Sequence, residues 1–363
     1  MTTKPIVYLL VIGSILTMGA NLAHGEEIFV LCNRLEVFIF STLPDGSSIR
    51  KELMNDAIRF NINRNGYFTV GVGSYANLTW YKGRIDSSFN ITKQTLPSIP
   101  PDADFVAISE DGKRVAWKTG ESYRKSVLTI EEYNGSEYKV LRKISVDGRI
   151  PTAFSFSPNS DLLAYFWGPP ESHTQDGFSL MLLDMKSPEK PPVEIAPPSL
   201  PMRLNPSRSV SPLWSPTGDF ILFEAQYKDS FSRGLYIVST DGRFLEPSPG
   251  EMWGLDGNYL IGFKQIKDDG LGEYIITETD ILTHKEKEHP AGKFKISDVG
   301  NMSLSPSGRK FVYAINKEIF VYDTMKKNAT SHGTVDPKIG GSDGFGLTVF
   351  QFFGKFFWIS PKD

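Results

Sequence analysis

The sequence is poor in the residues that build disulfides, metal sites and catalytic centres. Its 363 residues include a single cysteine, Cys32, and five histidines. One cysteine excludes a disulfide framework. The chain also lacks a Gly-x-Ser-x-Gly elbow, a His-Glu-x-x-His pair and a Walker-type phosphate loop, so the common hydrolytic and nucleotide-binding motifs are absent. We therefore expect no cofactor and no dedicated metal site.

A strong excess of charge of either sign is missing as well. The chain has 39 Lys and Arg against 42 Asp and Glu, a formal net charge of -3. This balance lacks the basic footprint of a nucleic-acid-binding protein. Hydrophobic residues make up 40% of the chain and aromatic residues 12%, which is enough for a large folded core.

Only one apolar run is long enough to concern a membrane. Lys4 precedes the run from Ile6 to Met18, and small residues lead from there to Glu26. This order is typical of a secretory signal peptide over residues 1–25. The alternative is an uncleaved anchor from Ile6 to Ala23, although this stretch of about 18 residues is short for a bilayer span. We predict export to the periplasm or the extracellular space, with membrane attachment only if the segment is retained.

What the sequence does contain is one short phrase repeated along the chain. A turn residue, glycine in all copies but one, is followed by an aliphatic, a small and an aromatic residue, as in "LSPSGRKFVYA". The turn residue falls at positions 66, 112, 160, 218, 257, 308 and 354. A spacing of roughly 40 to 60 residues is typical of propellers and solenoids.

Each phrase alternates with a second strand–turn–strand unit, such as "SVLTIEEYNGSEYKVLRKI" from Ser126. Asn134-Gly135 in that unit is a strong hairpin turn. The two units together give four strands, seven times over. The chain begins with a second unit, 35–53, and ends with a first unit, 347–359. We therefore predict an all-β, seven-bladed propeller of four-stranded antiparallel blades over residues 26–363, a monomeric ring closed by pairing of its N-terminal and C-terminal hairpins.

The phrases "FSPNSDLLAYF", "WSPTGDFILFE" and "LSPSGRKFVYA" resemble the WD40-like propeller repeat of the TolB family. The resemblance covers almost the whole mature chain and implies a propeller that contacts proteins of the cell envelope. The chain departs from the family because it has no room for the additional N-terminal domain of TolB. It also has no room for the hydrolase domain of the prolyl oligopeptidases, whose propellers carry the same phrase.

Few side chains qualify as site residues. His173, His289 and His332 are expected in or beside connecting loops that share a face, and Arg203 and Arg208 give a positive character to the proline-rich run 187–212. This run is interpreted as a recognition loop or as an irregular insertion. Five tryptophans in or beside the repeats are expected to pack between blades: Trp117, Trp167, Trp214, Trp253 and Trp358.

The leading functional hypothesis is an exported binding module. A rigid ring displays loops that engage a protein partner or an envelope component. The alternative is a propeller lyase or hydrolase acting on an oligosaccharide or a peptide, with an axial site in which histidines from several blades hold a metal ion. Asn-x-Ser/Thr sequons, which matter only in a host that glycosylates exported proteins, begin at Asn77, Asn90, Asn134, Asn301 and Asn328.

Overall fold

Within the residues that it describes, the computed structural model contains β-strands as its only regular elements, and these strands form seven antiparallel sheets. The structure describes residues 27–33, 36–42, 48–55, 57–74, 77–88, 90–103, 105–120, 126–145, 150–168, 178–196, 202–203, 211–227, 233–243, 245–248, 252–253, 258–267, 273–293, 303–304, 310–315, 318–323, 326, 328–334 and 355–359. The expected signal peptide lies outside these residues. Within them, no helix is long and apolar enough to cross a membrane.

The first four sheets are numbered along the chain. Sheet 1 has the strand order β29-β1-β2-β3, and sheets 2 to 4 follow the chain order, β4 to β7, β8 to β11 and β12 to β15. The strand bounds are β1 Glu27–Asn33, β2 Glu36–Thr42, β3 Ser48–Asn55, β4 Ala57–Ile62, β5 Tyr67–Ser74, β6 Asn77–Ile85, β7 Ile91–Thr95, β8 Phe105–Ile108, β9 Arg114–Thr119, β10 Val127–Tyr133, β11 Tyr138–Ile144, β12 Ile150–Phe156, β13 Leu162–Gly168, β14 Ser179–Asp184 and β15 Val193–Ala196.

The remaining three sheets use the rest of the chain. Sheet 5 holds β16 to β20, sheet 6 holds β21 to β24 and sheet 7 holds β25 to β28. The strand bounds are β16 Met202–Arg203, β17 Leu213–Trp214, β18 Phe220–Tyr227, β19 Arg233–Ser239, β20 Leu245–Pro247, β21 Met252–Trp253, β22 Tyr259–Lys267, β23 Glu273–Asp280, β24 Glu286–Lys293, β25 Ser303–Leu304, β26 Lys310–Ile315, β27 Glu318–Asp323, β28 Asn328–Thr334 and β29 Lys355–Ile359.

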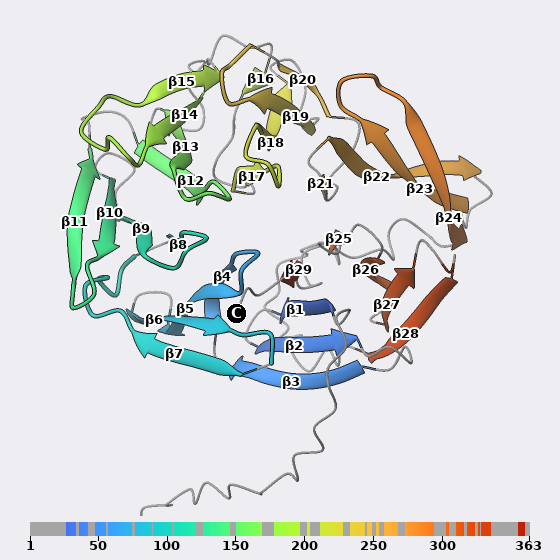
Figure 1. Cartoon of the computed structure of the whole chain (residues 1–363), viewed down its shortest axis with the longest axis horizontal. Helices are drawn as coiled ribbons and strands as arrows, with labels where there is room; N and C mark the ends of the chain where they lie inside the picture. The colour runs from blue at the N-terminus through green and yellow to red at the C-terminus, as the bar shows by residue number, and fades with distance from the viewer. Residues whose placement is uncertain are drawn as a thin grey trace, which may run out of the picture.

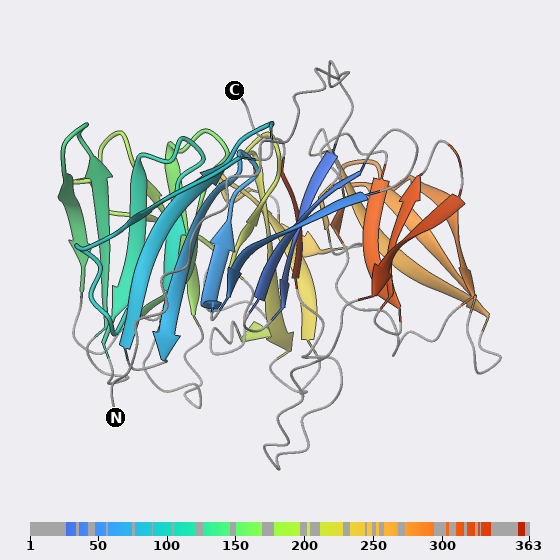
Figure 2. The same cartoon turned by 90° about the horizontal axis from the view of Figure 1, so that it is seen from below.

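The sheets are arranged around a common centre (Figure 1). The strand that comes first in each sheet order lies toward the middle, as β4, β8 and β12 show, whereas β3, β7, β11, β15, β24 and β28 lie at the outside. Seen from the side, the strands run between two opposite ends of the molecule (Figure 2).

Neighbouring strands are antiparallel, so the chain reverses direction at each connection. All connections of the same kind therefore lie at the same end of the molecule. The end where a first strand joins a second strand, and a third joins a fourth, is called the turn end. The end where a second strand joins a third, and where one sheet leads to the next, is called the crossover end.

The first and last parts of the chain meet in sheet 1. β29 pairs with β1, so that Trp358 lies opposite Phe29 and Phe356 opposite Leu31. The sequence predicted two strands from each terminus, with the C-terminal hairpin beside residues 37–40. That detail is wrong, because β1 lies between β29 and β2 and the split is three strands to one. Residues 347–354 of the expected hairpin lie outside the described residues.

The core lies between the sheets. The second strands of sheets 3, 4 and 5 carry the aliphatic–small–aromatic run, and all nine of its residues are buried. Alternate residues face different neighbours: Ala164 packs toward sheet 5, whereas Leu163 and Tyr165 pack toward sheet 3. The sequence prediction of strands buried on both faces is confirmed in these three sheets.

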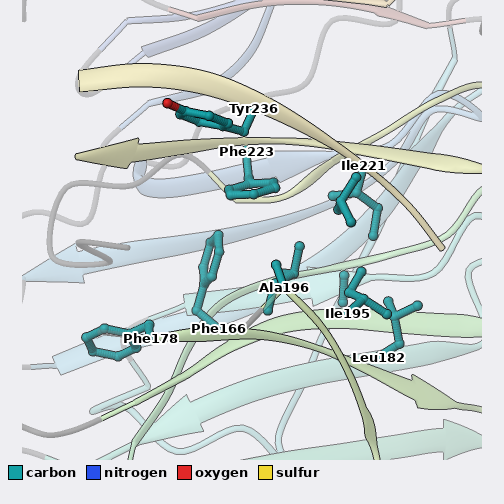
Figure 3. Close-up of a cluster of buried hydrophobic side chains, with 11 residues drawn as sticks. Phe166, Phe178, Leu182, Ile195, Ala196, Ile221, Phe223 and Tyr236 are labelled. Atoms are coloured by element: carbon teal, nitrogen blue, oxygen red, sulfur yellow. The ribbon is translucent and has the colours of Figure 1, made fainter. Parts of the chain in front are cut away.

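Figure 3 shows one such core, between sheets 4 and 5. Phe166 of sheet 4 points toward Phe223 of sheet 5, and the two ring centroids are 6.3 Å apart. Similar clusters join sheet 1 to 2, 2 to 3, 3 to 4 and 5 to 6. Each sheet interface therefore contributes its own share of buried apolar surface, which stabilises the arrangement.

The proline-rich run 187–212 is partly regular, contrary to its interpretation as one loop. It contains β15 and β16, and both β16 and β17 pair with β18. The first strand of sheet 5 is therefore built in two pieces, on either side of residues 204–212.

Candidate interaction face

The best-defined polar surface lies at the turn end, where first strands join second strands. In sheet 3, the Ser109 backbone nitrogen donates to the Arg114 carbonyl oxygen at 2.9 Å, and Ser109 Oγ accepts from the Arg114 nitrogen at 2.8 Å. Ser109 Oγ also donates to Asp111 Oδ1 at 2.5 Å. The same pattern recurs with Ser157, Asn159 and Leu162 in sheet 4, and with Ser215, Thr217 and Phe220 in sheet 5.

The turn residue of the repeated phrase has a left-handed backbone in each of these copies. The φ angles are 81° at Gly66, 71° at Gly112, 62° at Ser160 and 83° at Gly218. Glycine adopts this conformation at the lowest cost, which explains its recurrence in the sequence. In sheets 3, 4 and 5, the buried serine and the left-handed residue together fix the shape of the turn. In the turn of sheet 2, Asn63 takes the place of the serine, and its Oδ1 accepts from the Tyr67 nitrogen at 3.0 Å.

Hydrogen bonds connect these turns from sheet to sheet. Asn63 Nδ2 of sheet 2 donates to the Ser109 carbonyl oxygen of sheet 3 at 2.7 Å. The Glu110 carboxylate of sheet 3 accepts from the backbone nitrogens of Arg64 and Asn65, at 3.4 and 3.3 Å. A carboxylate that accepts two backbone N–H groups is a strong charge-assisted link.

Sheets 3 and 4 are joined in the same way. The Asp111 nitrogen donates to Ser160 Oγ at 3.3 Å, and Arg114 Nη1 donates to the Ser160 carbonyl oxygen at 2.7 Å. Arg114 Nε also pairs with Glu132 at 2.7 Å. The three turns that these hydrogen bonds connect, 63–66, 109–113 and 157–161, and the next turn around the ring, 215–219, are together called the turn belt.

Sheet 5 is attached to sheet 4 just beneath the belt. Trp214 Nε1 donates to the Ser155 carbonyl oxygen at 3.2 Å, and Ser155 Oγ donates to the Pro212 carbonyl oxygen at 2.5 Å. The belt therefore spans four sheets, each fixed to its neighbour by polar contacts as well as by apolar packing.

The exposed side chains of the belt are small or charged and of both signs. They include Asp111, Lys113, Asn159, Thr217 and Asp219. Lys186 lies beside them and pairs with Asp161, with Nζ and Oδ2 2.6 Å apart. Within the described ranges, no group of three His, Cys, Asp or Glu residues is arranged to hold a metal ion. This surface is suited to hydrogen bonding and charge pairing with a partner.

Two of the histidines expected in connecting loops lie in strands instead, and that expectation is wrong for them. His289 lies in β24 opposite Ile276, and His332 lies in β28. Both strands are at the outside of the molecule (Figure 1), away from the centre. An axial site shared by these two residues is therefore excluded by their place in the sheets.

The other candidates are only partly described. Arg203 lies in β16 opposite Gln226. His173 and Arg208 lie outside the described residues. The proposed loop face with these side chains thus remains a prediction.

Tryptophan packing between sheets is confirmed where the side chains are described. Trp117 is buried in the cluster between sheets 2 and 3, Trp167 packs against the cluster between sheets 3 and 4, and Trp214 packs against the cluster between sheets 4 and 5. The side chains of Trp253 and Trp358 lie outside the description.

One inter-sheet contact has no signal in the sequence. Lys82 Nζ of sheet 2 lies 4.8 Å from the ring centroid of Tyr133 and 4.9 Å from that of Tyr138, both in sheet 3. Burial lowers the pKa of Lys82, and burial raises the pKa of Tyr138. The ammonium group over two rings is a cation–π contact, and only the packing of the two sheets brings these residues together.

His332 gives a testable dependence of stability on pH. Burial lowers its pKa below the ordinary value of 6.5, and Lys310 lowers it further. Below that ordinary value the unfolded chain binds this proton more readily than the folded chain does, so the free energy of unfolding decreases as the pH falls. We expect the urea midpoint to fall between about pH 7.5 and about pH 5, and to fall less in His332→Gln. An unchanged pH slope in the variant would contradict this assignment.

Comparison with known proteins shows similarity in fold alone. No family model matches the sequence, and no curated protein matches it. A putative 6-phosphogluconolactonase from Bacteroides fragilis is 12% identical over 93% of this chain and 99% of that chain, with a TM-score of 0.53. A functionally unknown protein from Desulfotomaculum acetoxidans is 13% identical over 93% and 100% of the two chains, with a TM-score of 0.52. The fold is a β-propeller.

TolB from Acinetobacter baumannii is also similar to this chain. It is 13% identical over 93% of this chain and 82% of that chain, with a TM-score of 0.45. Because no family model matches, the TolB-type repeat resemblance stays at the level of the propeller fold. Propellers host many unrelated functions, so function has to be argued from the site.

Proposed function

We propose that the protein is an exported, closed seven-bladed β-propeller that binds a protein partner through the turn belt. The seven sheets and the β1–β29 pairing support closure of the ring, with each sheet forming one blade. A closed ring leaves no sheet with an uncovered apolar face. The predicted signal peptide supports export.

The observation that carries binding is the chain of hydrogen bonds through the belt. Asn63, Glu110 and Ser160 fix three successive turns to one another, so their exposed side chains are held in place before a partner arrives. A surface that is already ordered loses less conformational entropy on binding. The belt displays charged and amide groups, whereas its hydroxyls of Ser109, Ser157 and Ser215 are buried and bonded within their own turns. This arrangement favours recognition over catalysis.

Two double variants of equal net charge test the belt as the binding surface. Lys113→Glu with Asp219→Lys reverses two exposed belt charges. Lys143→Glu with Asp102→Lys reverses two exposed charges that lie outside the belt, toward the crossover end. The immobilised protein would first be used to isolate a partner from an extracellular or periplasmic extract, and affinity for the purified partner would then be measured.

We expect the belt variant to weaken binding by about tenfold or more, because charge reversals at a contact surface replace attraction by repulsion. The matched variant should bind within about twofold of the wild type, as remote surface charges have small effects. Failure to isolate any saturable partner, or equal binding by both variants, would refute the proposal.

A further inference from the structure

Asn-x-Ser/Thr sequons are more frequent in this chain than its composition requires. It has 15 asparagines, of which five begin a sequon. Ser and Thr occupy about 15% of all positions, so chance alone would place about two sequons. Four of the five, at Asn77, Asn90, Asn134 and Asn328, fall on described residues.

All four of these asparagines are exposed, and so is the hydroxyl residue two positions later in each sequon. The hydroxyl residues are Thr79, Thr92, Ser136 and Thr330. The intervening Leu78 is buried, which shows that β6 directs Asn77 and Thr79 to solvent by strand alternation. A bulky group on any of the four side chains would therefore extend into solvent without displacing the core.

Three of the four sites share one structural position. Asn90, Asn134 and Asn328 each lie at the connection between the third and fourth strands of a sheet, at the turn end. They belong to sheets 2, 3 and 7, which lie on one side of the ring together with sheet 1 (Figure 1). Asn77 lies where β5 leads into β6, at the crossover end.

The local geometry leaves the reacting nitrogen accessible. Asn134 Oδ1 accepts from the Ser136 nitrogen, Ser136 Oγ and the Glu137 nitrogen, at 3.0, 2.9 and 3.0 Å. These bonds hold the turn through the oxygen and do not use Nδ2. Asn90 Nδ2 donates to Asp86 Oδ2 at 3.0 Å, and a substituted amide nitrogen keeps one hydrogen with which to maintain that bond.

We propose that Asn77, Asn90, Asn134 and Asn328 are acceptors of N-linked oligosaccharide. The donor is an oligosaccharide attached through a pyrophosphate to a lipid carrier, and the reaction is catalysed by a transferase of the host secretory pathway. Asn Nδ2 bonds to the anomeric carbon of the sugar and loses one proton. The bond between that carbon and the pyrophosphate oxygen breaks, and the lipid pyrophosphate leaves.

This inference rests on the export stated in the proposed function, and it adds a boundary to the binding surface. Glycans at Asn90 and Asn134 occupy the outer rim of the turn end in sheets 2 and 3. The described rim of sheets 4 and 5, near Lys186 and Asp241, has no sequon. A partner on the turn belt is thereby directed to the part of the belt formed by sheets 4 and 5.

The test is secretion of the full chain from a eukaryotic host, once with its own residues 1–25 and once with an unrelated secretory leader. Site occupancy is read by peptide mass spectrometry after enzymatic deglycosylation, which converts each occupied asparagine to aspartate. We expect conversion at all four asparagines. Single variants provide matched controls: Thr92→Val and Thr330→Val should abolish conversion at Asn90 and Asn328, whereas Thr92→Ser and Thr330→Ser should retain it.

The outcomes separate this inference from the export proposal. Secreted, folded protein with unmodified Asn90, Asn134 and Asn328 would overturn the glycan sites, whichever leader was used. Glycosylated protein from the unrelated leader, with no export from the protein's own leader, would support the glycan sites and overturn export. Conversion that persists in Thr330→Val would show spontaneous deamidation and would also overturn the assignment at Asn328.

Discussion

Truncation after Gly354, which removes β29, is expected to cost most of the stability of the protein. The Ile28–Cys32 segment of β1 would lose its partners on one side. A net loss of roughly 0.5–1.5 kcal/mol per ladder hydrogen bond amounts to several kcal/mol against a typical total of about 5–15 kcal/mol. We expect a decrease in Tm of about 10 °C or more, or insoluble protein.

The matched control is truncation after Ile359, which removes residues beyond β29 and keeps the pairing with β1. Its thermal unfolding should follow that of the full chain. If both truncated proteins melt at the same temperature as the full chain, β29 does not close the ring and the closed-propeller proposal is wrong. The protein truncated after Gly354 could be insoluble. In that case, a soluble protein truncated after Ile359 would still assign the loss of stability to the removal of β29.

Gly112→Ala is expected to destabilise the protein far more than Gly218→Ala, although both residues occupy the same position of the repeat. Both have a left-handed backbone, with φ of 71° and 83°, which costs about 1–2 kcal/mol for alanine. A Cβ at Gly112 would also lie 2.4 Å from Tyr67 Cε1, whereas a Cβ at Gly218 would lie 3.6 Å from its nearest neighbour, Pro158 Cδ.

Overpacking adds about 1–3 kcal/mol, so we expect a loss of roughly 2–5 kcal/mol for Gly112→Ala and about 1–2 kcal/mol for Gly218→Ala. Urea unfolding of the two variants would measure the difference. The Tyr67 ring is the obstacle because it also lies against Arg84, whose guanidinium carbon is 5.2 Å from the ring centroid. Equal losses in the two variants would show that the backbone angle alone decides the cost and that the contact with sheet 2 is unimportant.

The repeat explains why so much of the fold was predictable from the sequence. Local backbone preference and burial are properties of short segments. The sequence shows the first in turn residues such as Gly112 and Gly218, and the second in runs such as Val115-Ala116-Trp117. The four-stranded unit and its antiparallel order follow from them. The place of β1 was missed because a strand beside the predicted signal peptide carries no repeat phrase and no hairpin turn to mark it.

The candidate site was much less predictable. His289 and His332 were expected in or beside connecting loops, yet they lie within β24 and β28, which are outer strands of their sheets. The turn belt was not predicted from the sequence, although several of its residues were recognised as turn residues. Its decisive contacts join Asn63 to Ser109 and Asp111 to Ser160, residues that come from different sheets.

The amino-acid sequence alone determined that this protein would be all-β, built of repeated four-stranded units and free of disulfides, since strand, turn and burial preferences act over a few neighbouring residues. Only the tertiary structure decided which strand pairs with the C-terminal strand and which turns are hydrogen-bonded to one another. It also decided which side chain packs against the rings of Tyr133 and Tyr138. Those outcomes depend on how closely two sheets approach and on the register at which they meet, and no short segment encodes either quantity by itself.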